Sequence, residues 1–95
     1  MYAVVGRFAF RTAPDAALRA RVEAEIIDPL SQAPGFQNLY FIRATETEAN
    51  VVHLWNSQAD AEQGLDLIAP RIKQLHQEGL VSGVDRRMGE VVAQR

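Results

Sequence analysis

The side chains best suited to chemistry in this sequence lie in one short apolar segment, Val51 to Trp55. His53 and Trp55 are two residues apart, so they share one face if the segment is a strand. An imidazole there could act as a base near neutral pH, and an indole could line a pocket and donate one hydrogen bond. The two residues could equally be structural, with His53 hydrogen-bonded in the core or at an interface and Trp55 anchoring the strand against a helix.

Three further polar side chains are candidates for binding a ligand: Arg7, Asn38 and Tyr40. Arg7 is the single charge within the apolar segment Tyr2–Phe10, and a charge there must be paired or face something polar. It could hold an anionic ligand or form a salt bridge across a dimer. Tyr40 and Asn38 lie in the segment Phe36–Arg43, where each could contact a ligand or simply belong to the packed sheet.

The composition excludes several classes of function. The chain has no cysteine, which rules out disulfides, thiolate metal sites and cysteine nucleophiles, and its two histidines are too far apart for a metal motif. A net charge of −2 gives no attraction to nucleic acid or to acidic membranes. No apolar run approaches the roughly 18 residues of a membrane span, and the chain start lacks a signal-peptide layout. We therefore expect a cytoplasmic protein that binds neither nucleic acid nor membrane.

The order of the elements indicates one α+β domain. A chain of 95 residues builds a single core, so residues 1–95 are expected to form one domain. Runs rich in valine and aromatic residues predict strands at Tyr2–Phe10, Phe36–Arg43, Val51–Trp55 and Val84–Val92. Two amphipathic helices separate them, which gives the order βαββαβ of the ferredoxin-like fold with an antiparallel sheet.

Caps and prolines set the expected ends of the helices. The first helix should begin at Ala13–Asp15 with proline in its first turn, and Pro29 should kink its last turn. The second should begin at the capping pattern Ser57–Asp60. Pro70 should break or kink it just before that residue, and Gly79 should end it.

The strands have more apolar surface than two helices can cover. In Tyr2–Phe10, Val4 and Phe8 alternate with Val5 and Ala9, so both faces are apolar. Helices on one side leave the other face of an antiparallel sheet open, and an apolar open face needs a cover. A second copy related by a twofold axis is the simplest cover. We therefore expect a homodimer paired sheet to sheet.

Two short motifs resemble the dimeric α+β barrel proteins, specifically the antibiotic biosynthesis monooxygenase (ABM) family. They are Pro34-Gly35-Phe36, which opens the second strand, and Trp55-Asn56-Ser57, which joins the third strand to the second helix. The resemblance implies a dimeric α+β barrel and an oxidoreductase: a cofactor-independent monooxygenase of a small phenolic or quinol-type aromatic, needing neither metal nor flavin. His53 and Trp55 are then the catalytic candidates, and Arg7, Asn38 and Tyr40 the ligand-binding ones.

The sequence also departs from the patterns that this resemblance implies. Val51 or Val52 stands where polyketide-oxidising members have an asparagine, and the second helix has no tyrosine. In the haem-degrading branch, the asparagine and tryptophan positions correspond to Arg7 and Gly64 here, and Lys73 lies near the histidine position, with His76 three residues further along. This argues against haem degradation. The alternative is a non-catalytic homodimer that binds a small ligand.

Overall fold

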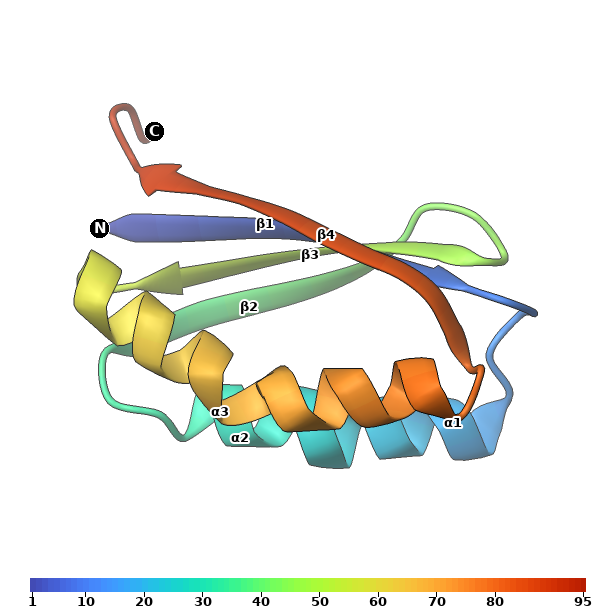
Figure 1. Cartoon of the computed structure of the whole chain (residues 1–95). Helices are drawn as coiled ribbons and strands as arrows, with labels where there is room; N and C mark the ends of the chain where they lie inside the picture. Colours follow the sequence, from blue (N-terminus) through green and yellow to red (C-terminus); the bar gives the residue numbers. More distant parts are fainter.

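Four strands in one antiparallel sheet and two helical segments make up the computed structural model, which describes all 95 residues (Figure 1). The strands are β1 (Tyr2–Phe10), β2 (Phe36–Arg43), β3 (Glu48–Trp55) and β4 (Val81–Glu90). They lie in the order β2-β3-β1-β4, and every neighbouring pair is antiparallel. This is the ferredoxin-like α+β fold, and it confirms the fold class expected from the sequence.

The first helical segment is continuous from residue 16 to residue 31. It consists of α1 (Ala16–Val22), the π-helical turn η1 (Glu23–Ile27) and α2 (Asp28–Ser31). Asp15 is the N-cap, because its side-chain oxygen accepts the backbone N–H of Leu18 at 2.8 Å. Pro14 therefore precedes the cap, and the expectation of a proline in the first turn is wrong.

The π-helical turn lies directly before Pro29, where a kink was expected. Asp28 donates its backbone N–H to the carbonyl of Glu23, five residues back, so the helix is wider here than a normal α-helix. Proline has no N–H and crowds the turn before it. The wider turn gives that crowding room, and the helix continues to Ser31.

The second helix, α3 (Gln58–Gln77), begins and ends as the sequence predicts. The Ser57 hydroxyl oxygen accepts the backbone N–H of Asp60 at 3.2 Å. At the other end Gly79 has a positive φ of 75°, and Leu80 donates its N–H to the carbonyl of Leu75. Pro70 does not interrupt the helix; instead the ribbon of α3 changes direction near its middle (Figure 1).

Two strands begin earlier than their local sequence indicates. β3 starts at Glu48 rather than Val51, and β4 spans Val81–Glu90 rather than Val84–Val92. In both cases the cause is the partner strand, because Glu48 pairs with Ala9 and Val81 pairs with Phe10 at the far end of β1. Long-range pairing extends a strand over residues whose own preference for it is weak.

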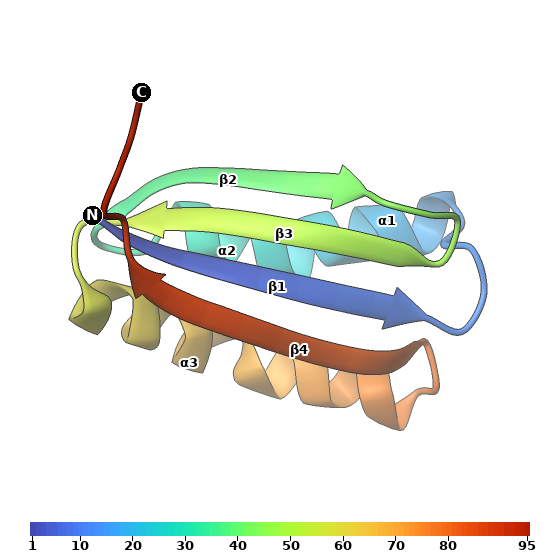
Figure 2. The same cartoon turned by 90° about the horizontal axis from the view of Figure 1, so that it is seen from above.

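Both helical segments pack on the same face of the sheet, and in Figure 2 they lie behind it. The core between the layers is one cluster of buried apolar side chains: Val4, Phe8, Phe10, Val22, Ile26, Leu30, Ala49, Val51, Trp55, Ala61, Leu65, Ile68, Leu75 and Val81. The other face has no cover within the chain. Val5, Ile42 and Tyr40 on that face are 49%, 48% and 57% exposed. No helix has both the length and the hydropathy to cross a bilayer.

Candidate functional site

His53 and Trp55 lie together on the helix-facing side of β3. The indole Nε1–H of Trp55 donates a hydrogen bond to Nδ1 of His53 at 2.6 Å. The two rings meet edge to face with centroids 5.8 Å apart, and Phe36 meets Trp55 in the same manner at 5.6 Å. Both side chains are buried. The polar atom of the indole is therefore satisfied by its neighbour.

This hydrogen bond decides the state of the imidazole. Because Nδ1 accepts the hydrogen bond from Trp55, the neutral ring carries its own proton on Nε2. Burial lowers the pKa of His53 to about 4, and the positive charge of Arg86 contributes in the same direction. At neutral pH His53 is thus uncharged and is a weaker base than an ordinary histidine.

The space around Trp55 is filled. Trp55 is fully buried, and its six-membered ring lies against Gly64 of α3. A Cβ at position 64 would clash with that ring, so glycine is what allows α3 to approach the indole. Trp55 anchors β3 to the helix layer, which is the structural role that the sequence left open beside a catalytic one.

The three candidate ligand-binding residues lie on the opposite face of the sheet. Arg7 pairs across the ladder with Asn50, Asn38 with Leu54, and Tyr40 with Val52. All of these alternate with the helix-facing positions, so Arg7, Asn38 and Tyr40 point to the uncovered face. The sheet therefore separates these three residues from His53 and Trp55, and the five candidates do not form one site within the protomer.

Arg7 is paired within its own chain. Its guanidinium donates to the carboxylate of Glu48 on one side and to Asp85 on the other, the latter at 3.0 Å. These hydrogen bonds raise the pKa of Arg7 above its ordinary value, and they favour the charged guanidinium. The residue joins β1 to both of its neighbouring strands on the uncovered face.

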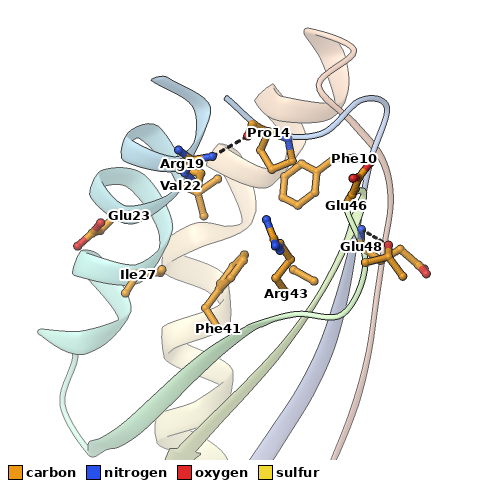
Figure 3. Close-up of a pocket in the computed structure, with 12 residues that line it drawn as sticks. Phe10, Pro14, Arg19, Val22, Glu23, Ile27, Phe41, Arg43, Glu46 and Glu48 are labelled. Carbon is orange, nitrogen blue, oxygen red and sulfur yellow. Dashed lines mark hydrogen bonds between the residues drawn. The ribbon is translucent and has the colours of Figure 1, made fainter. Parts of the chain in front are cut away.

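A cavity of about 240 Å³ lies elsewhere in the layer, between the α1–η1 helix and the β2–β3 hairpin (Figure 3). Its apolar walls come from both layers: Phe10, Phe41 and Ala49 from the sheet, and Val22 and Ile27 from the helix. Ala49 is six residues before Trp55, or about 20 Å along the strand. Neither His53 nor Trp55 lines this cavity.

Arg43 is the charged group that enters this cavity. Its guanidinium is directed toward the space between Val22 and Phe10 (Figure 3). The five ion pairs of the structure belong to Arg7, Arg21 and Arg71, so the charge of Arg43 has no carboxylate partner. At the helix side, Arg19 is engaged with the carbonyl of Pro14 at 2.9 Å.

Sequence reasoning did not select this arginine, because a charge at the end of a strand is normally solvated, and Arg43 is indeed exposed. One signal was present. Arg43 is two residues after Phe41, so it shares the helix-facing side with that ring. An arginine in phase with the buried face of a strand is a candidate for a ligand contact even at the strand's end.

Comparisons with known proteins find structures of the same fold but no match by sequence. No protein-family model and no curated protein sequence matches the chain. Among solved structures, SnoaB of Streptomyces nogalater, a cofactor-independent oxygenase, aligns with a TM-score of 0.76 at 18% identity, over 98% of this chain and 94% of that one. A dimeric ferredoxin-like protein from an uncultured marine organism aligns with a TM-score of 0.71 at 14% identity, over 100% and 98%. The chain has the fold of the antibiotic biosynthesis monooxygenases.

This likeness confirms the ferredoxin-like α+β fold of the protomer that the two short motifs implied. At identities this low the likeness extends to the fold alone and does not carry a reaction. The departures noted in the sequence have structural counterparts. Val51 is buried on the helix-facing side with Trp55. At Gly64, the Trp55 ring occupies the space that a larger side chain would need.

Proposed function

We propose that the protein is a homodimeric ABM-type oxygenase that oxidises a small phenolic or quinol-type aromatic without a cofactor. The observation that carries the proposal is the cavity between helix and sheet, because a mostly apolar pocket with a few polar groups is the usual form of a small-molecule site. The ABM fold, which SnoaB shares, supports the reaction type.

The chemistry would use the substrate as the source of electrons. Loss of the hydroxyl proton makes the ring electron-rich, so that it can react with O₂ directly. One oxygen atom enters the ring, the other leaves as water, and the phenol becomes a quinone. The protein's part is to hold the ring in a dry pocket and to stabilise the negative charge, which an unpaired guanidinium such as that of Arg43 can do.

Two places on the helix-facing side could host this reaction. The sequence favours the His53–Trp55 pair as catalytic residues, and the cavity lies at the other end of β3. We favour the cavity, because its walls leave room for a ring and the pair fills its own space. His53 and Trp55 stay in the proposal as the competing centre, which the following experiment separates.

The experiment is O₂ uptake with a panel of hydroquinones and anthrones. We expect turnover by the wild type with single-ring substrates, and loss of turnover in Ala49→Ile, which fills the cavity from the sheet. Arg11→Gln, an exposed arginine outside the cavity, is the matched surface control. Loss of turnover in His53→Gln and Trp55→Phe but not in Ala49→Ile would move the reaction to the pair. Absence of turnover with every substrate would refute the oxygenase.

The homodimer has its own support and its own test. The uncovered face of the sheet exposes Val5, Tyr40 and Ile42, and a second copy would bury them. The marine structure with this fold is described as dimeric. Sedimentation at micromolar concentration should give twice the protomer mass, and Val5→Asp, which places a charge on that face, should give the protomer. A wild type that sediments as a monomer contradicts this part of the proposal.

A second candidate function is a homodimer that binds a small ligand without turning it over. The observation in its favour is the His53–Trp55 hydrogen bond, because it occupies the imidazole that the sequence offers as a base. The two functions differ in one result. A binder holds the aromatic compound in the cavity and consumes no O₂.

A further inference from the structure

We propose that the cavity selects a single-ring aromatic carboxylate, with Arg43 as the counter-ion of the carboxylate group. The inference rests on the proposed function for the place of the ligand, and it adds the ligand's size and charge. It concerns binding, so it holds for an oxygenase and for a binder alike.

Size is the first argument. The cavity measures about 240 Å³. An engineered cavity of about 150 Å³ is known to hold benzene, whereas drug-sized ligands occupy roughly 300–1,000 Å³. The space here therefore suits one ring with one or two small substituents. A fused three-ring polyketide is too large for it unless helix and sheet move apart.

Shape is the second argument. Phe10 and Phe41 line the cavity from the sheet, and Val22 and Ile27 line it from the helix (Figure 3). The ring of Phe8 packs against both phenylalanines, with centroid distances of 6.2 Å to Phe10 and 6.1 Å to Phe41. The two cavity rings are thus held in place before a ligand enters, as aromatic ligands require for offset stacking.

Charge is the third argument. Arg43 lines the cavity as an exposed residue, its guanidinium is directed into the space, and it has no carboxylate partner. A planar guanidinium binds a planar carboxylate by two parallel hydrogen bonds. Such a group extends from an aromatic ring in the plane of the ring, so the ring can lie between the apolar walls while the carboxylate meets Arg43.

Of the acidic residues around the cavity, only one is placed to repel this anion. Glu48 is engaged with Arg7, and Glu23 is directed away from the cavity (Figure 3). Glu46, in the β2–β3 turn, is the remaining carboxylate on the lining. Its charge repels an anionic ligand, so Glu46→Gln should strengthen binding of a carboxylate.

The test is a calorimetric titration of the whole protein without O₂, using two compounds of nearly equal shape. One is 4-hydroxybenzoate, and the other is the uncharged 4-hydroxybenzamide. We expect the wild type to bind the acid roughly 10- to 100-fold more tightly, which is the usual range for charge-assisted hydrogen bonds. In Arg43→Gln the preference should disappear, and in Arg11→Gln it should persist. Anthracene-2-carboxylate, which has three rings, should bind far more weakly.

Equal binding of acid and amide by the wild type would overturn the charge assignment. Equal binding of one-ring and three-ring acids would overturn the size limit. No binding of either one-ring compound would overturn the site itself. Failure of the proposed oxygenase is distinguishable from all three, because it removes O₂ uptake and leaves these affinities unchanged. Circular dichroism of Arg43→Gln establishes that the variant is folded.

Discussion

The layer between helices and sheet is filled completely at one end and incompletely at the other. At the Trp55 end, the indole is bonded to His53, meets the edge of Phe36 and lies against Gly64, so no space is left beside the indole and its N–H is satisfied. At the other end, Phe41 and Arg43 border an open cavity. Residue type alone would place chemistry at the first end, whereas unused space and an unpaired charge place it at the second.

The largest expected effect on stability comes from truncating a side chain at the filled end. Trp55→Ala removes the largest fully buried side chain and leaves His53 without its donor. We expect the free energy of unfolding to fall by about 3–5 kcal/mol, the usual range for a large aromatic in a core. Urea denaturation measures it. Leu67→Ala, an exposed position on α3, is the matched control and should change stability little.

Trp55→Phe separates packing from the hydrogen bond, because it keeps an aromatic ring and removes the indole donor. If Trp55 is an anchor, this variant loses less stability than Trp55→Ala. The assignment of a structural role to the Trp55 end is wrong if Trp55→Ala remains as stable as the wild type while ligand binding or O₂ uptake is lost. The indole would then serve function and not the core.

The next largest effect is the pH dependence of stability at His53. Its pKa is about 4 in the folded chain, against about 6.5 for an ordinary histidine, so the unfolded chain binds more protons between these values. Stability contributed by the neutral ring is therefore complete above about pH 6.5 and is lost as the pH falls toward 4. The loss amounts to roughly 3 kcal/mol at most.

Urea denaturation at several pH values from 7.5 to 4 measures this loss. Carboxyl groups also titrate in the lower part of the range, so the useful quantity is the difference between wild type and His53→Gln. His76→Gln, which replaces the exposed second histidine, is the matched control variant. Parallel profiles for wild type and His53→Gln would show that the imidazole is not held neutral by burial.

The sequence predicts the filled end better than the open one. The period of two in a strand places His53 and Trp55 on one face, and the Val-rich and aromatic runs locate β1 and β2 to the residue. It does not reveal that Arg7 lies across the sheet from His53, because that depends on the register in which Arg7 pairs with Asn50. Register is a long-range property that no single segment contains.

The cavity depends on still more of the chain. Phe10, Phe41 and Ala49 come from three strands, and the helix wall depends on where Asp15 starts α1 and how η1 widens before Pro29. A space is what remains after these elements pack, so a pattern of residue types does not report it. The only local indication of the cavity in the sequence was the two-residue spacing that places Arg43 on the same strand face as Phe41.

The smallest expected effect compares one added side chain at each end. Ala49→Ile places three carbon atoms toward the cavity, so it should leave the free energy of unfolding unchanged or raise it by about 1 kcal/mol, as cavity-filling changes commonly do. Gly64→Ala adds a single methyl group where the Trp55 ring already lies, and overpacking there should cost about 1–3 kcal/mol. Urea denaturation of the two variants gives both values.

If the smaller addition at position 64 were tolerated and the larger one at position 49 were not, the filled and open ends would have been assigned the wrong way round. If both were tolerated, the core at Trp55 would have more freedom than its contacts with Gly64 and His53 allow.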